Sequence, residues 1–578
     1  MTALRRLATM SGLARISREI WFDLGWIFLA FVGFIMVGFG LRDPWPADEP
    51  RFAAIARDMW LSGEWLIPRA GGDLYQDKPP LHFWLMALGI GLTGSLRVGF
   101  LLPSMLASFA TLCLVYDIVR RLHGREAGLA AALLLACSLQ FVITMRGAQI
   151  DATLIFFCTL ALYASMRCLL LGGGWHWAAV GGIAAGLGVI DKAVGFLTLG
   201  LWVLAWLLQR SGFKGVTRPS AQEIALLLGA FLLTISLWLV PMLWYVAQSG
   251  SAELIAYRDE LLFQQTLERY TQAWHHIRPW YYYLIEVIPF LWLPVSALLI
   301  WLVPAWTRDW RERSAVVWLP LLWGLAVIVF FSLSTGKRGI YILPALPALV
   351  IAASAHLPQL WQRLAVQRTS LALSAVLVVP AVVMAAALWL GHPRATQFIA
   401  KSELRDAMPL WVFASVSLIV WLACLWRRPL LAWPLVVASL TSVWGLIAAP
   451  QLNPIRSAEA FMTGVQQQVG EHEELGLLAY KEQFLLHLRR DTVNFGHRRW
   501  REGDAEAYDA ARWLMADEGR VLLVPDYFVD TCFAEAARKS AGISSRNEWF
   551  LVRGNANEDC VRQGDLGKVI RYAPLAGT

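Results

Sequence analysis

The chain has 578 residues, of which 57% are hydrophobic and only 16% are charged. A typical soluble domain carries about 25% charged residues, and one soluble core rarely grows beyond ~250–300 residues, so this composition excludes an ordinary soluble protein. The net charge of +8 does not indicate nucleic-acid binding, because most Lys and Arg residues lie in short connections between apolar blocks and form no basic stripe.

The apolar residues form blocks of about 17–25 residues, the length that crosses a hydrocarbon layer of ~30 Å as a helix. Arginines precede the first block and no small-residue cleavage site follows it, which predicts an uncleaved first span. A shorter apolar stretch, 81–92, is expected to lie in the interface or to re-enter the membrane. Hydropathy predicts thirteen spans, approximately at 24–41, 98–119, 127–144, 152–171, 175–190, 194–209, 222–246, 281–303, 315–333, 340–356, 369–391, 409–426 and 429–448.

The orientation of the spans follows from the basic connections between them. If the amino terminus is cytoplasmic, these connections all fall on the inner side, as the positive-inside rule requires. Thirteen spans then place the carboxyl end outside, together with the polar loops 42–80 and 248–280. We therefore expect an all-α polytopic membrane domain over residues 1–450, with interfacial helices in these two outer loops.

The polar tail, residues 451–578, is expected to form a separate α/β domain. Three β-like runs (475–480, 521–525 and 549–552) alternate with helix-like stretches at 482–489 and 505–515. Cys532 and Cys560 lie in this tail, and outside the cytoplasm they could either pair or stay free. The other five cysteines are expected to be small residues of the membrane core, and no Cys/His spacing predicts a metal cluster.

The first outer loop contains Asp48, Glu49 and Arg51, followed by apolar residues at helical spacing. This pattern predicts an amphipathic helix that begins near Asp48 and lies on the membrane surface. Asp48 is open to two interpretations. It is either a helix cap, or a functional carboxylate that meets the Arg51 cation one turn later.

Two further charged residues have equally open interpretations. Lys78 follows Asp77 and precedes two prolines and an apolar stretch, so it is either a snorkelling interfacial lysine or a cation held at a fixed height. Asp151 opens the fourth span, where it is either a helix cap or a functional carboxylate, since an unpaired carboxylate entering the membrane is costly. Asp191 and Lys192 lie in a similar position.

Charged residues also gather at the outer ends of other spans, including Arg269, His276 and Lys337. His275 and His276 are adjacent and lack the i, i+4 spacing of a helical zinc site, so a metal is not favoured there. Ionisable residues are nearly absent from the middles of the spans. This distribution predicts a cavity for anionic groups at the outer membrane surface and disfavours a transporter, whose sites usually lie at the bilayer midplane.

Together these segments resemble the polyprenyl-phosphate-sugar glycosyltransferases of the glycosyltransferase C (GT-C) class, which implies a membrane domain of the GT-C type. The resemblance covers roughly residues 25–350. Within the class, the chain looks most like the bacterial lipid A 4-amino-4-deoxy-L-arabinose transferases, which have about thirteen spans and a periplasmic α/β tail. That family commonly has Glu where this sequence has Asp77. The resemblance rests on Asp48-Glu49 and on Tyr75-x-Asp77-Lys78-Pro79-Pro80 with Phe83-Trp84. It is supported by Asp151, Asp191-Lys192, the element His275…Pro279…Tyr283-Leu284, and Lys337…Tyr341-x-Leu343-Pro344.

The resemblance implies transfer of aminoarabinose from undecaprenyl phosphate to a lipid A phosphate, which changes the charge of lipopolysaccharide. It implies a monomeric, multi-pass protein of the bacterial inner membrane, with the active site and the tail in the periplasm. No cofactor is expected, and dependence on a divalent metal stays open. The expected partners are the undecaprenyl-phosphate-linked sugar, lipid A or another membrane glycolipid, and the phospholipid bilayer, without nucleic acid.

Charge then suggests a role for each candidate. Lys78 and Arg51 are expected to hold the donor phosphate, and Asp48 and Asp151 to stabilise an oxocarbenium-like transition state or to orient the sugar. The further substrate-binding candidates are Glu49, Tyr75, Asp77, Arg57, Arg146, Lys192, Arg269, His276, Lys337 and Tyr341. Two alternatives remain at this stage: a glycosyltransferase that moves another lipid-linked sugar to protein or glycan, and a lipid-linked sugar transporter.

Overall fold

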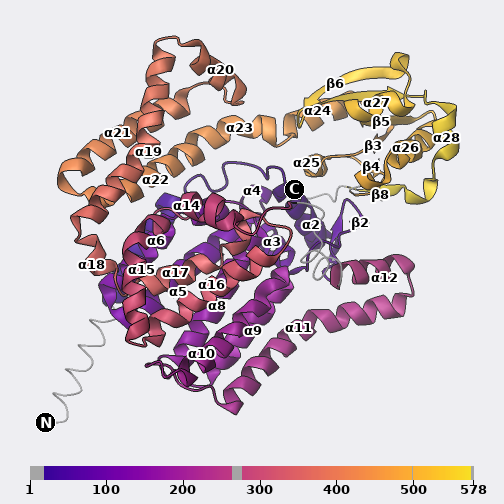
Figure 1. Ribbon diagram of the computed structural model, residues 1–578. Helices are drawn as coiled ribbons and strands as arrows, with labels where there is room; N and C mark the ends of the chain where they lie inside the picture. Colours follow the sequence, from indigo (N-terminus) through magenta and orange to yellow (C-terminus); the bar gives the residue numbers. More distant parts are fainter. Residues whose placement is uncertain (1–17, 263–275, 498, 574–578) are drawn as a thin grey trace. The chain divides into compact units, whose positions relative to one another are not determined.

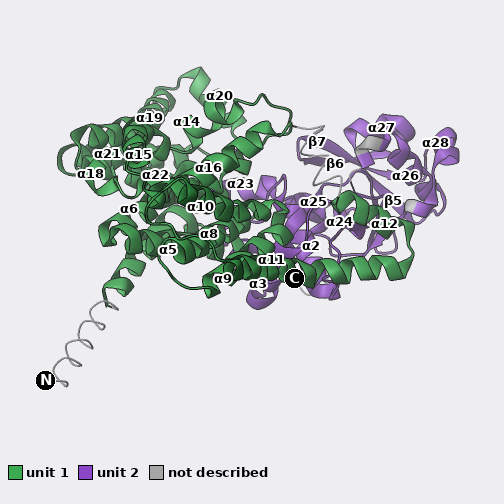
Figure 2. Cartoon of the chain, turned by 60° about the horizontal axis from the view of Figure 1, so that its bottom comes forward, with its two compact units in different colours: residues 1–39, 103–402, 406–448 green, residues 40–102, 403–405, 449–578 purple. Residues whose placement is uncertain are grey.

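The structure, a computed structural model, describes residues 18–262, 276–497 and 499–573. It is mostly helical (Figure 1) and divides into two compact units, shown in green and purple in Figure 2. Unit 1 comprises Met1–Phe39, Pro103–Ser402 and Asp406–Ala448. Unit 2 comprises Gly40–Leu102, Glu403–Arg405 and Ala449–Thr578, so it combines the first predicted outer loop with the carboxyl-terminal tail.

Unit 1 is built from helices. They are the segment 18–36 ending in η1 (Val32–Met36), α5 (Leu102–His123), α6 (Arg125–Ala136), α7 (Leu139–Met145), α8 (Ile150–Leu169), α9 (His176–Lys192), η2 (Val194–Leu199), α10 (Gly200–Arg210), α11 (Ala221–Ser249), α12 (Ala252–Asp259), η4 (Tyr283–Val287), α14 (Ile288–Leu291), α15 (Val295–Arg311), α16 (Ala315–Leu333), η5 (Gly339–Ile342), α17 (Ala345–Ala353), α18 (Leu357–Trp361), α19 (Leu364–Trp389), α20 (Pro393–Lys401), α21 (Met408–Arg427), η6 (Pro429–Leu431), α22 (Ala432–Val443) and η7 (Trp444–Ala448).

Among the described residues, eight helices are long and apolar enough to cross a membrane. The count rises to ten if two bent pairs, α6 with α7 and the 283–291 segment with α15, are each one span. The other three predicted spans coincide with α9, with η2 and α10, and with α17, which are shorter. The chain is therefore a multi-pass membrane protein. The short predicted segment 81–92 forms a 13-residue helix, α3 (Leu81–Thr93), in unit 2.

The helices of unit 1 differ in how much apolar surface they bury. In the most apolar stretch of α8, 83% of the residues are buried, whereas in α11 the share is 17%. This contrast places α8 in the interior of the bundle and leaves α11 with an apolar surface suited to lipid. The α9 helix packs closely on α11, because a Cβ atom at Gly182 would lie 2.2 Å from the carbonyl oxygen of Leu227. Small residues commonly allow such close contacts between membrane helices.

Unit 2 mixes helices with short strands. Its elements are α2 (Glu49–Ser62), β1 (Arg69–Ala70), β2 (Asp73–Leu74), α3, α4 (Leu96–Gly99), α23 (Ala449–Arg456), α24 (Glu459–Gln467), β3 (Glu474–Leu477), α25 (Glu482–Leu485), β4 (Thr492–Asn494), η8 (Arg499–Glu502), α26 (Ala505–Met515), β5 (Arg520–Pro525), α27 (Asp526–Cys532), η9 (Glu535–Ala537), β6 (Arg538–Ser544), β7 (Asn547–Arg553), α28 (Glu558–Gln563), η10 (Leu566–Lys568) and β8 (Ile570–Tyr572).

The tail contains a six-stranded mixed sheet with strand order β6-β7-β5-β3-β4-β8. The central β3 pairs in parallel with β4 and β5, and the outer pairs are antiparallel. The three β-like runs of the sequence coincide with β3, β5 and β7, which are largely buried, whereas the exposed edge strand β6 lacks such a pattern. A disulfide joins Cys532, at the end of α27, to Cys560 on α28.

The first-loop helix, α2, differs from the expected surface helix. Phe52, Ile55 and Met59 are buried as expected, but Ala53 and Ala54 are buried too. The reason is that α3, β1 and α25 all pack on α2 within unit 2. A segment of the distant tail therefore covers part of this helix, and its place at the membrane surface stays a prediction.

Candidate functional site

The charged candidates form two groups, one in each unit. In unit 2, Asp48 occupies the position before α2, but its side chain makes no capping hydrogen bond. It lies instead 3.6 Å from Nη1 of Arg51, one turn later. The capping interpretation therefore accounts for the position of Asp48 in the chain, while the carboxylate itself contacts a cation.

Arg51 lies between two carboxylates. Its Nε donates a hydrogen bond of 2.8 Å to Oε1 of Glu482, a residue of the tail that the sequence pattern did not single out. Burial lowers the pKa of Arg51, but Tyr75 and Glu482 outweigh this effect, so the pKa is raised overall. Burial raises the pKa of Glu482, and Arg51 reverses this, so that carboxyl has a lowered pKa. Both groups therefore stay charged near neutral pH.

The neighbouring candidate Glu49 is already engaged within its own loop. Arg42 donates from both terminal nitrogens to the two carboxylate oxygens, at 2.5 and 2.7 Å, and the backbone N–H of Trp45 donates to one of them at 2.9 Å. Such a bidentate pair fixes geometry as well as charge. These contacts hold the chain that leads into α2.

Arg57 is almost completely buried, with 3% of its surface exposed. It donates to the carbonyl of Leu485 at 3.2 Å, to the Asp58 carboxylate at 3.1 Å and to the Tyr572 hydroxyl. Burial lowers the pKa of Arg57, but Tyr572 and Asp58 raise it by more. The hydrogen bonds of Arg57 to Leu485 and Tyr572 therefore join α2 to the tail.

The lysine motif lies between β2 and α3. Tyr75 is buried, with its ring against Phe83 and His497. Asp77 and Lys78 are half-buried and follow directly. The structure therefore places Asp48, Arg51 and Tyr75 close together, and Lys78 three residues after Tyr75.

The second group, in unit 1, centres on Asp151. This residue is the second residue of α8, and the cap position belongs to Gln149, so the capping interpretation of Asp151 is wrong. Its carboxylate pairs with Nζ of Lys192 at 2.5 Å, and that ammonium lies 4.8 Å from the centre of the Tyr341 ring. Asp191, fully buried, accepts a hydrogen bond from Thr153 at 2.9 Å.

Two other candidates of unit 1 contact backbone carbonyls. Arg146 donates to Val37 at 2.8 Å and to Phe34 and Ile35 at 3.2 Å, at the end of the helix 18–36, where carbonyls lack helical partners. Lys337 donates to the carbonyls of Arg278, at 3.0 Å, and Ser334, and burial lowers its pKa.

The remaining candidates are His276 and Arg269. His276 is exposed and accepts a backbone hydrogen bond from Lys337 at 2.9 Å. Arg269 lies outside the described residues. Within the described part of the chain, no group of three His, Cys, Asp or Glu side chains is arranged to hold a metal ion.

The chain is 32% identical over 445 residues to the undecaprenyl phosphate-alpha-4-amino-4-deoxy-L-arabinose arabinosyl transferase of Pseudomonas aeruginosa, covering 73% of this chain and 74% of that protein. The chain belongs to this arabinosyl transferase family. An arabinosyl transferase 1 from Pseudomonas fluorescens is 29% identical over 484 residues, covering 78% of each protein.

Solved structures agree with this assignment at the level of fold. The arabinosyl transferase chain matches the crystal structure of ArnT from Cupriavidus metallidurans bound to undecaprenyl phosphate, with a TM-score of 0.70 and 18% identity, over 91% of this chain and 97% of that one. The apo form of that protein matches with a TM-score of 0.68 and 16% identity, over 96% and 99%. The family model for dolichyl-phosphate-mannose-protein mannosyltransferase matches residues 77–244. The chain is therefore a membrane glycosyltransferase of the GT-C class.

Proposed function

We propose that this protein transfers 4-amino-4-deoxy-L-arabinose from undecaprenyl phosphate to a phosphate of lipid A. The observation that carries the proposal is 32% identity, over 73% of the chain, to a transferase named for this donor. The charged groups support it, because cations paired with carboxylates are what an anionic lipid donor and an amino sugar require.

The reaction breaks the bond between the anomeric carbon and a phosphate oxygen of the donor. A lipid A phosphate oxygen forms the new bond, and undecaprenyl phosphate leaves with the electron pair. The acceptor is already an anion, so no strong general base is needed. Asp48 and Asp151 stabilise the positive charge that develops on the sugar, and Lys78 and Arg51 bind the donor phosphate and stabilise it as it leaves.

The other candidates divide according to their contacts. Lys192, Tyr341, Tyr75 and Asp77 are proposed to contact substrate, because they adjoin the residues assigned to the reaction. His276 and Arg269 are proposed as further contacts to anionic groups. The main role of the remaining four is proposed to be support of the loops, because their charged groups already bind protein atoms; these are Glu49, Arg57, Arg146 and Lys337.

We propose that the monomeric protein spans the bacterial inner membrane thirteen times, with a transmembrane domain over residues 1–450. The reaction takes place at the periplasmic face, where residues 451–578 form a folded domain. The positive-inside pattern supports this orientation. The Cys532–Cys560 disulfide supports it too, because disulfides persist in oxidising compartments such as the periplasm.

The test is transfer by the purified protein in proteoliposomes that contain radiolabelled undecaprenyl-phosphate aminoarabinose and lipid A. The proposal predicts label on lipid A, dependent on protein and donor. Label that reaches only another added acceptor would assign a different transferase activity. Label that crosses the bilayer on its original carrier, without transfer, would assign a transporter and contradict the proposal.

A further inference from the structure

Glu482 connects the carboxyl-terminal tail to the charged residues of the first loop. It begins the short helix α25, which packs on α2 within unit 2. Its carboxylate lies 2.8 Å from Nε of Arg51, 431 residues earlier in the chain. The side chains of Arg51 and Glu482 are 8% and 19% exposed, so water screens this pair only weakly.

The contact fixes how Arg51 presents its remaining N–H groups. A guanidinium is a planar fork, and a hydrogen bond at Nε limits rotation of that plane. The terminal nitrogen Nη1 then lies 3.6 Å from Oδ1 of Asp48. Without the Glu482 carboxylate, the guanidinium loses its bond at Nε and keeps its contacts with Asp48 and Tyr75, which do not fix the same plane.

The segment that carries Glu482 is itself held in place. Arg57 of α2 donates to the carbonyl of Leu485 in α25, at 3.2 Å. A few residues before Glu482, the backbone N–H of Ala479 donates to the buried Glu506 carboxylate at 2.8 Å. Glu482 therefore projects from a segment with fixed ends, as a positioning group requires.

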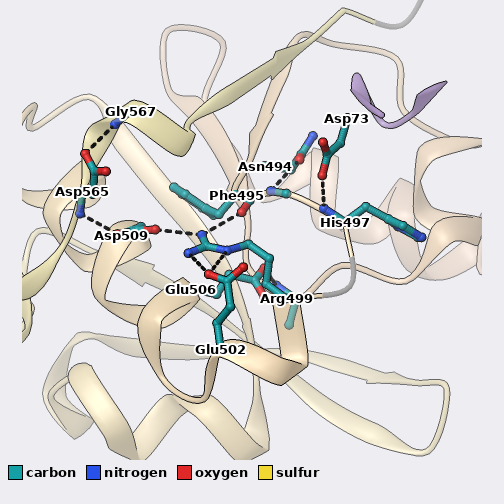
Figure 3. Close-up of polar contacts among 12 residues, drawn as sticks. Asp73, Asn494, Phe495, His497, Arg499, Glu502, Glu506, Asp509, Asp565 and Gly567 are labelled. Atoms are coloured by element: carbon teal, nitrogen blue, oxygen red, sulfur yellow. Dashed lines mark hydrogen bonds and ion pairs between the residues drawn. The ribbon is translucent and has the colours of Figure 1, made fainter. Parts of the chain in front are cut away.

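Further hydrogen bonds hold the first loop against the same sheet. Asn494, at the end of β4, donates to the carbonyl of Gly71 at 2.9 Å, and the backbone N–H of His497 donates to the Asp73 carboxylate at 2.9 Å. Figure 3 shows the contact of Asp73 with His497, and beside it Arg499 with its tail partners Glu502 and Asp509. The hairpin that precedes Lys78 thus rests on the tail as well.

We propose that Glu482 is a positioning residue for sugar transfer, which acts through Arg51 to hold the Asp48–Arg51 pair in its reactive arrangement. The inference rests on the proposed function, because it assigns the tail a part in that reaction. The tail then contributes to the reaction through the Glu482 carboxylate, in addition to supporting the hairpin that precedes Lys78.

The experiment compares four purified variants by steady-state transfer from the lipid-linked donor: Glu482→Gln, Glu482→Asp, Arg51→Lys, and Glu482→Gln combined with Arg51→Lys. Glu482→Gln weakens a hydrogen bond between two charged groups, so we predict that it lowers kcat/KM about ten-fold. Glu482→Asp restores part of the loss. In the Arg51→Lys background, Glu482→Gln changes kcat/KM less than two-fold, because the group through which it acts is gone.

A matched control is Glu474→Gln, which breaks an ion pair with Arg520 inside the same sheet. It should leave transfer within two-fold of the wild type. Hydrogen exchange gives a second readout that does not need activity. Glu482→Gln should speed exchange at the start of α2 and leave exchange in β3 and β5 unchanged.

The outcomes separate the two proposals. If wild-type protein fails to transfer the sugar, the proposed function falls, and the role of Glu482 falls with it. If wild-type protein transfers sugar but Glu482→Gln is equally active, only the positioning role is overturned. Two other results would also overturn it. One is a kcat/KM in the double variant that falls by the product of the two single losses, and the other is faster hydrogen exchange throughout the tail sheet. Both indicate a general structural role for Glu482.

Discussion

Asp151→Asn tests whether the carboxylate of Asp151 is needed for the reaction or only for folding. The Asp151–Lys192 pair is mostly buried, with side chains 9% and 14% exposed. Removing one partner of a buried pair leaves an uncompensated charge and costs about 3–5 kcal/mol, so we expect this variant to be less stable. If Asp151 also stabilises the transition state, kcat should fall by about 10²–10³, as for the loss of one stabilising group in other enzymes.

A second substitution separates these two effects. The double variant Asp151→Asn with Lys192→Met removes both charges, which is often neutral or even stabilising in a buried site. We therefore expect thermal unfolding in detergent to return close to the wild-type temperature while transfer stays low. Asp23→Asn is the matched control, because Asp23 is buried and pairs with Arg125 at 2.6 Å. It should lose stability but retain transfer per folded molecule. Recovery of transfer in the double variant would refute a role for Asp151 in the reaction.

Three further predictions concern unit 2. Burial raises the pKa of the Glu506 carboxyl from 4.5 to about 7. The protonated carboxyl therefore stabilises the folded state below pH 4.5, and this stabilisation is lost as the pH rises through 7. In unfolding measured across pH, Glu506→Gln should be more stable than wild type at pH 8, by up to roughly 3 kcal/mol. Replacing Cys532 and Cys560 by Ser opens a loop with a sequence separation of 28 residues and should destabilise the tail by about 3 kcal/mol, seen as faster proteolysis. Lys78→Ala should weaken binding of undecaprenyl phosphate at least ten-fold by titration, while Lys539→Ala, on the exposed strand β6, should not.

The parts of the fold that depend on local pattern could be predicted from the sequence. Long apolar blocks indicated the membrane helices, and the buried runs at β3, β5 and β7 indicated a sheet in the tail. The start of α2 beside Asp48 followed from its proline and its helical spacing. These features are decided by residues close together in the chain.

The contacts that organise the charged groups could not be predicted in the same way. Nothing near Glu482 marks it as the partner of Arg51, because the two residues meet only when the tail packs on the first loop. Arg146 looked like an anion-binding residue, since the sequence does not show that helix-end carbonyls lie beside it. Similarly, the adjacent Asp48 and Glu49 looked alike, yet Glu49 is engaged by Arg42.

Lipid A mass spectrometry tests the central claim most directly. A Gram-negative host that lacks its own aminoarabinose transferase but makes the donor would carry either this chain or its Asp48→Ala variant, with membrane expression checked for both. We predict a lipid A mass increment of one aminoarabinose for the wild-type chain and none for the variant. Unmodified lipid A in cells with the wild-type chain would contradict the proposed activity, and an equal increment from both chains would contradict the role of Asp48.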